Sequence, residues 1–323
     1  MTFRSCVLAM ILVVGAAPCA FAVSDGAPQS IAPLMTPNAR AAGLGQSFVS
    51  IADDATASFW NPGGLAWQTK PDVVLYYSKL AEGLADDISY NYLAYSRPMW
   101  GGGLGFGVIF LNLGESDIID EQGSVLGNFN SFDFIPMVAY GAPLTDNLAY
   151  GATFKFIYSR LSPQIKELGI DDGTGISFGG DLALIYRIPG IRFQAGILVQ
   201  NLGLDIVYND QNQPEDLPRN TKAGVSWRPL ETPLNKLLLI GEVTKNLVYM
   251  EGETILKGGV EYTYYDMVSA RIGRIQDHEG RIEDYTFGVG LKVKSIGLRF
   301  DYASVPQAED LPRVNRFAIG FTY

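Results

Sequence analysis

Histidine, cysteine and positive charge are scarce in this chain of 323 residues. Its two cysteines, Cys6 and Cys19, lie near the N-terminus, and its single histidine is His278. If residues 1–22 are removed as argued below, no disulfide, thiol nucleophile or zinc cluster can form. We therefore expect no enzyme, no metal and no cofactor. A net charge of −10 also excludes the basic footprint that a nucleic-acid partner requires.

Long apolar runs are absent after the first 22 residues. Residues 1–22 combine Arg4, an apolar core and the sequence Ala20-Phe21-Ala22, which is the pattern of a secretory signal peptide. No later stretch approaches the 18 or more apolar residues of a membrane-spanning helix. Glycine (36 residues), tyrosine (17) and phenylalanine (17) are plentiful. An exported chain of this kind is a periplasmic β-protein or an outer-membrane β-barrel.

From position 71 onward apolar residues recur at every second position, which is typical of strands. Tyr150, Phe154 and Tyr158, for example, alternate with Thr153 and Lys155. The pattern predicts fourteen strands, an even number as single-chain bacterial barrels require. They cover 72–79, 88–98, 103–113, 129–140, 148–159, 176–188, 190–201, 220–228, 236–246, 254–265, 267–275, 285–294, 295–303 and 315–323.

The connections between these strands alternate between long and short. A membrane barrel has long loops outside and short turns in the periplasm, so the pattern favours an all-β, transmembrane, antiparallel β-barrel in the bacterial outer membrane. Its partners would include outer-membrane lipid. The last strand ends on an aromatic residue, Tyr323, as outer-membrane barrels characteristically do. That resemblance implies handling by the barrel-insertion machinery.

The polar faces of the predicted strands carry charges of both signs. We expect these charges to line the lumen, because an arginine or lysine that faces lipid at mid-bilayer costs about 2–4 kcal/mol. On this basis Phe154→Arg should lower barrel stability far more than Lys155→Ala. The predicted lumen-lining residues are Lys155, Asp181, Arg187, Arg192, Glu242, Glu261, Arg271, Arg299 and Asp301.

Residues 36–68 differ from both the signal and the strands, because they are rich in alanine and glycine. A helix is predicted to begin at Asp53 and Asp54, whose carboxylates can cap free N–H groups. It is predicted to end at Asn61, because Pro62 disfavours the α region at the residue before it. Gly63 and Gly64 are predicted to turn the chain. On these residues alone, the stretch is a surface cap or a plug inside the barrel.

The sequence NARAAGLGQSFVSIADDATASFWNPGGLA (38–66) resembles the N-terminal signature of PorV/PorQ-type proteins in the FadL-like superfamily of outer-membrane proteins. Leu44 and Gly63 depart mildly from that signature. The resemblance implies a fourteen-stranded barrel over 71–323, with the segment 23–70 folded into the lumen as a hatch. The matching positions include Arg40, Gly43, Gly45, Phe48, Asp53, Asp54, Trp60, Asn61, Pro62 and Leu65.

The resemblance implies two alternative functions. FadL-type members pass hydrophobic molecules such as long-chain fatty acids inward, by a rearrangement of the hatch. PorV-type members receive exported proteins for type IX secretion. Our first hypothesis is a hatch-gated channel for small hydrophobic compounds, and the alternative is an accessory protein that binds secreted proteins. In the first, the hatch is held by Arg40, Asp53, Asp54, Asn61 and Pro62, and the ligand contacts Phe48, Phe59, Trp60 and Leu65.

Overall fold

The computed structural model describes residues 32–80, 87–119, 123–162, 173–208, 214–248, 254–308 and 311–323. The predicted signal peptide, 1–22, lies outside these ranges. None of the helices in these ranges is long and apolar enough to cross a membrane.

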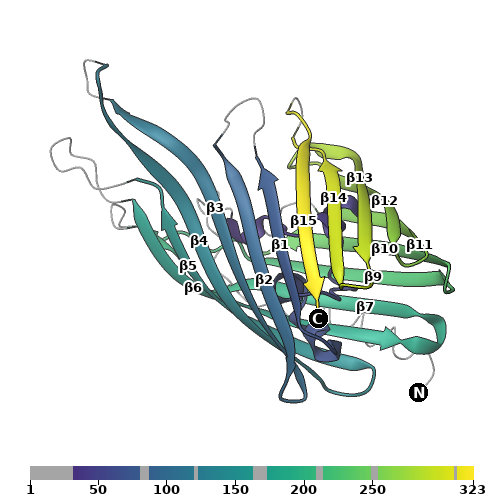
Figure 1. The fold of residues 1–323 in the computed structure, drawn as a ribbon. Coiled ribbons are helices and arrows are strands. Elements are labelled where there is room, and N and C mark those ends of the chain that lie inside the picture. Colours follow the sequence, from purple (N-terminus) through teal and green to yellow (C-terminus); the bar gives the residue numbers. More distant parts are fainter. Residues whose placement is uncertain are drawn as a thin grey trace.

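Fourteen antiparallel strands close into a barrel, as predicted (Figure 1). Neighbours in sequence pair with each other, and β1 (Asp72–Lys79) also pairs with β15 (Val314–Thr322), which closes the sheet. A further strand of two residues, β8 (Val207–Tyr208), pairs with the start of β6. The remaining strands are β2 (Ser89–Met99), β3 (Gly102–Ile119), β4 (Val125–Pro143), β5 (Leu148–Arg160), β6 (Thr174–Ile188), β7 (Phe193–Gly203), β9 (Asn220–Glu231), β10 (Asn235–Asn246), β11 (Ile255–Tyr264), β12 (Val268–Asp277), β13 (Ile282–Val293) and β14 (Leu298–Val305).

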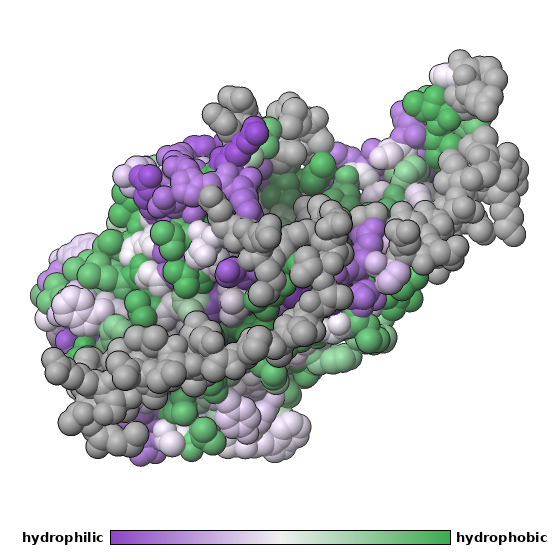
Figure 2. All heavy atoms as spheres, turned by 180° about the vertical axis from the view of Figure 1, so that it is seen from behind, coloured by the Kyte–Doolittle hydropathy of each residue, from purple (hydrophilic) through white to green (hydrophobic). Residues whose placement is uncertain are grey.

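The connections after β2, β4, β6, β9, β11 and β13 are short and share one end of the barrel, which we call the short-turn end. At the opposite, long-loop end, β3 and β4 project beyond their neighbours (Figure 1). The prediction ended the first of these strands at 113 and began the second at 129, and both limits were wrong by several residues. Beyond the membrane both faces of a hairpin meet water, so the alternation that indicates a strand is lost. Figure 2 shows hydrophobic side chains on this projection as well as on the barrel wall.

The two faces of the strands point as the alternation predicts. On β5, Phe154 is 57% exposed on the outer surface, whereas Lys155 is fully buried inside. Leu75, Phe178 and Val289 are likewise exposed on the outside. The apolar band therefore faces lipid, and the charges are kept away from it.

The inner surface, however, is not uniformly charged. The inward positions of β1 to β5 include many buried apolar side chains, among them Tyr76, Tyr92, Ile109, Ile135 and Ile157. The buried charges of β6 and β9 to β12 are Asp181, Lys222, Glu242, Glu261 and Arg271, and those of β1, β4 and β5 are Asp72, Asp133 and Lys155. The interior therefore has an apolar side and a charged side, and a segment that packs within it must match both.

Residues 36–68, called here the N-terminal segment, pack against these inward faces on several sides of the barrel. A Cβ added to Gly141 of β4 would lie 2.0 Å from the Pro62 carbonyl oxygen, and one added to Gly273 of β12 would lie 2.1 Å from the Gly45 nitrogen. Backbone therefore meets backbone where only glycine fits. The described N-terminal helices are η1 (Ala32–Leu34), α2 (Ala39–Gly43), α3 (Ala57–Trp60) and η2 (Pro62–Trp67).

Helix α3 begins later than predicted. The Asp54 carboxylate accepts hydrogen bonds from the Thr56 backbone N–H and hydroxyl, which holds the chain in a turn before the helix starts. The predicted end is correct, since Asn61 is extended, with φ −169°. Gly63 and Gly64 do not form the predicted turn, because Pro62 begins the 3₁₀ helix η2 and both glycines belong to it.

Candidate functional site

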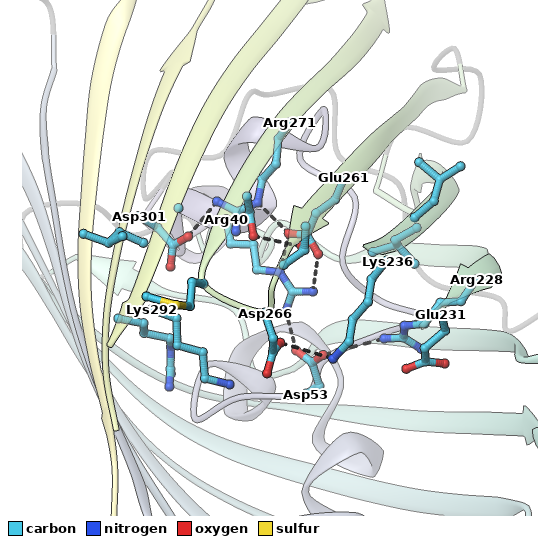
Figure 3. Close-up of a pocket in the computed structure, with 18 residues that line it drawn as sticks. Arg40, Asp53, Arg228, Glu231, Lys236, Glu261, Asp266, Arg271, Lys292 and Asp301 are labelled. Atoms are coloured by element: carbon cyan, nitrogen blue, oxygen red, sulfur yellow. Dashed lines mark hydrogen bonds and ion pairs between the residues drawn. The ribbon is translucent and has the colours of Figure 1, made fainter. Parts of the chain in front are cut away.

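A chain of ion pairs joins the N-terminal segment to the charged side of the barrel (Figure 3). Arg40 of α2 donates from Nε and Nη2 to the two carboxylate oxygens of Glu261, both at 2.8 Å, and from Nη1 to Asp53 at 2.8 Å. Glu261 also accepts from Arg271 Nε at 2.6 Å, and Arg271 donates onward to Asp301 at 2.6 Å. Positive and negative groups thus alternate from the segment across β11, β12 and β14.

A second group of polar contacts lies at the start of β1. Arg299 of β14 donates to both oxygens of Asp72, each at 2.7 Å, and lies 4.0 Å from Asp54. Asp72 also accepts from the Ala55 N–H at 2.8 Å. These contacts tie the first strand, a late strand and the N-terminal segment together.

The two adjacent carboxylates of the segment differ in their electrostatics. Burial raises the pKa of Asp54; the nearby Arg299 charge opposes this, and the Asp72 charge reinforces it. Burial also acts to raise the pKa of Asp53, but the charges of Arg40 and Arg228 outweigh it, so that the pKa is lowered. Asp53 is therefore the ionised partner of the arginines.

Asn61 holds the segment through its amide rather than through charge. Its Nδ2 donates to the Val49 carbonyl at 2.8 Å and to the Leu184 carbonyl of β6 at 3.1 Å. Its Oδ1 accepts from the Gly63 N–H at 3.0 Å, which caps η2. Pro62, next in the chain, supplies the carbonyl that lies against Gly141. The Asn-Pro pair thus both ends one helix and starts the next.

The four apolar residues predicted to contact a ligand are Phe48, Phe59, Trp60 and Leu65, and all have no exposed surface. The rings of Phe48 and Phe59 each lie 5.8 Å from the Trp60 ring in edge-to-face contact. The Trp60 Nε1 donates to the Pro37 carbonyl at 2.8 Å, and the Lys222 ammonium lies 4.9 Å from the Trp60 ring. No solvent-sized space therefore lies beside these side chains in this conformation.

The predicted lumen-lining charges have specific partners. Lys155 donates to Asn201 at 2.9 Å and pairs with Asp181 at 2.8 Å. Glu242 accepts from the backbone N–H groups of residues 48 and 49, at 2.9 and 3.0 Å. The Arg187 guanidinium stacks over a ring of the segment, 3.8 Å from the centre of Trp67. The interior charges therefore bond to one another and to the segment.

Arg192 does not lie where the alternation placed it. A short 3₁₀ turn, η4 (Pro189–Ile191), delays the start of β7, so Arg192 takes a left-handed conformation, with φ 54°, in the turn before the strand. Its side chain is half exposed and lies 3.4 Å from Glu231. It belongs to the short-turn end and not to an inward strand face.

A polar cavity of about 330 Å³ lies at the short-turn end, between the N-terminal segment and strands β9 to β14 (Figure 3). The ion-pair chain described above forms its floor. Side chains near the short turns form its mouth. The charged residues of the floor are Arg40, Asp53, Glu261, Arg271, Arg299 and Asp301, and those of the mouth are Arg228, Glu231, Lys236, Asp266 and Lys292.

Two residues that position the segment were not singled out from the sequence. Asn38 accepts from the Arg40 N–H at 2.8 Å and donates to Asp54 at 2.9 Å. Its position just before an alanine-rich helix is the signal that identifies a capping residue. Asp72 opens β1, and a charge at the start of an otherwise apolar strand was the available signal.

Comparison with known proteins gives a family and a fold. The family described as type IX secretion system protein PorV matches residues 27–252. The Ralstonia pickettii toluene transporter TbuX is similar in structure, with a TM-score of 0.55 and 13% identity over 88% of this chain and 98% of that chain. The Pseudomonas putida toluene transporter TodX gives a TM-score of 0.54 and 12% identity over 87% and 95%.

At such low identity these structures establish a shared FadL-like fold and nothing more. Among curated proteins, none matches the sequence. The fold and the family together place the chain in the bacterial outer membrane.

Proposed function

The chain belongs to the PorV family, and on this premise we propose that it is an accessory protein of a type IX-like secretion system, which binds exported proteins at the outer membrane. The observation that carries the proposal is the closed interior around the N-terminal segment. Phe48, Phe59 and Trp60 are fully buried, so a hydrophobic molecule has no passage beside them in the described conformation. A closed interior favours a role in which the surface of the barrel binds the partner.

The projecting hairpin of β3 and β4 supplies a surface for this role. A tilted strand of about 9–11 residues crosses a membrane, whereas β3 has 18 residues and β4 has 19. Near the tip, Ile119, Val125 and Leu126 are each more than half exposed. Clustered apolar side chains that meet water mark interaction sites. The hairpin tip therefore suits the binding of an exported protein outside the membrane.

The test compares secretion with uptake in the host bacterium. We expect the double variant Ile119→Asp and Leu126→Asp to assemble normally, to reduce the exported protein in the medium, and to leave uptake of a labelled fatty acid unchanged. Ile296→Asp is the matched control, because Ile296 is equally exposed but lies in a turn at the short-turn end. Normal secretion by the hairpin variant at wild-type abundance would exclude the proposed surface.

The second candidate is a channel for small hydrophobic compounds gated by the N-terminal segment as a hatch. It is favoured by the way the segment is held, through polar contacts of Arg40, Asp54 and Asn61 with the wall. A rearrangement that broke these contacts would free the aromatic cluster to contact a ligand. Cells that lack the protein would then take up less labelled fatty acid. Undiminished uptake together with impaired secretion rejects this candidate.

A further inference from the structure

Basic side chains gather at the mouth of the polar cavity, in a chain whose net charge is −10. Arg228, Lys236 and Lys292 all line this mouth (Figure 3). The carboxylates beside them are Glu231 and Asp266. This local excess of positive charge runs against the composition of the whole chain.

The two carboxylates at the mouth are already engaged. Asp266 accepts from Lys236 at 3.2 Å, and its other oxygen lies 3.4 Å from Lys294. Glu231 lies 3.4 Å from Arg192. Within the described ranges, Lys292 forms no ion pair within 4 Å. The mouth therefore holds more cations than its own carboxylates neutralise.

One of the three cations at the mouth, Arg228, is only loosely paired. Arg228 Nη2 lies 3.8 Å from Asp53, whereas Arg40 donates to the same carboxylate at 2.8 Å. A carboxylate that entered the cavity would meet Arg228 and Lys292 without displacing a short ion pair. Hydrogen bonds to charged groups of this kind are among the stronger polar contacts in proteins.

We propose that this cavity binds an acidic peptide segment of a periplasmic protein, with its carboxylates between Arg228, Lys236 and Lys292. The short-turn end of an outer-membrane barrel faces the periplasm, and these side chains line a cavity inside the ring of strands. A peptide that enters between the short turns reaches them, whereas a lipid headgroup is held in the bilayer around the barrel. A volume of about 330 Å³ is at the small end of ligand sites and suits a few side chains.

This site is independent of the outer surface proposed above, because it lies at the opposite end of the barrel. A chain that fails to bind an acidic peptide in the cavity therefore still allows the binding of exported proteins at the hairpin tip to be tested, and the reverse also holds. A peptide bound here contacts Arg228, which lies next to Asp53 of the N-terminal segment, so the site adjoins the ion pairs that hold the segment.

The experiment uses the full mature chain purified in detergent and a short fluorescent peptide rich in aspartate and glutamate. We expect saturable binding that weakens as salt increases, and no binding of the matched asparagine–glutamine peptide. The double variant Lys236→Gln and Lys292→Gln should bind on the order of tenfold more weakly. Lys70→Gln is the control, because Lys70 is exposed just before β1 and does not line the cavity.

A charge-preserving variant keeps the test decisive. Lys292→Arg should bind the acidic peptide about as well as the wild-type chain, which separates loss of charge from misfolding. Equal binding of both peptides, or unchanged affinity of the double variant, overturns the proposal. Binding to vesicles with anionic lipid that is lost in the double variant, with no peptide binding, also overturns it in favour of a lipid site.

Discussion

Arg40→Gln tests how the N-terminal segment is held. The change removes the two-bond contact with Glu261 and the bond to Asp53. The Arg40 side chain is 20% exposed and that of Glu261 8%. The free energy lost when the pair is broken should therefore lie between about 0–1 kcal/mol, as for exposed pairs, and about 3–5 kcal/mol, as for buried ones. Glu261 keeps Arg271 at 2.6 Å. We therefore expect the contact between segment and wall to weaken by about 2 kcal/mol.

A loss of this size raises the population of the detached segment roughly 30-fold. Hydrogen exchange of the backbone amides of residues 36–68, measured in lipid, reports that population directly. We expect faster exchange in the variant and a rise in small-solute leakage through planar bilayers. Arg281→Gln is the control, because Arg281 is exposed in the turn between β12 and β13. Exchange and leakage equal to the control would refute the reasoning that these ion pairs hold the segment.

Three further substitutions probe the interior. Gly273→Ala puts a Cβ 2.1 Å from backbone of the N-terminal segment, so we expect about 1–3 kcal/mol of destabilisation in urea unfolding. Gly241→Ala is the control, because its Cβ would meet only the Lys257 carbonyl oxygen, in ordinary contact at 4.0 Å. Lys155→Ala leaves the buried Asp181 carboxylate unpaired and should cost about 3–5 kcal/mol; the double variant with Asp181→Leu should recover most of the loss. The pKa of Asp53 is lowered in the fold. The ionised Asp53 carboxylate therefore stabilises the folded state above its unfolded pKa of about 4, and this stabilisation is lost as the pH falls through its pKa in the folded state. The stability difference between wild type and Asp53→Asn should therefore shrink below about pH 4, and a constant difference would contradict the assignment.

The barrel was predictable because lipid and lumen impose opposite chemistry on alternate residues. Phe154 and Lys155 show this, as neighbours that point to opposite faces. The prediction failed where that contrast ends, at the hairpin of β3 and β4, and at Arg192, where a 3₁₀ turn interrupts the register. Local alternation contains no information on such interruptions.

The interior was harder to predict, because it depends on contacts between residues far apart in the chain. From the sequence we expected Lys155→Ala to lower barrel stability far less than Phe154→Arg. The structure changes this expectation, because Lys155 is buried against Asp181 and Asn201. Lys155→Ala should therefore lower the free energy of unfolding by as much as Phe154→Arg, for which we expect about 2–4 kcal/mol. The packing of Trp60 could not be derived from the sequence, because the inward faces of β1 to β5 carry apolar residues where the pattern suggested only polar ones.

The contacts of Asp72 bear on the order in which the protein assembles. Its carboxylate joins Arg299 and Thr322, which follow it by 227 and 250 residues. Contacts between such distant residues form slowly, because the loop entropy is lost before they form. We therefore expect the Asp72 carboxylate of the first strand to remain in water until the last strand pairs with the first. Closure of the barrel and locking of the N-terminal segment would then be one late event, so a chain cut short before β14 should leave the segment accessible to protease.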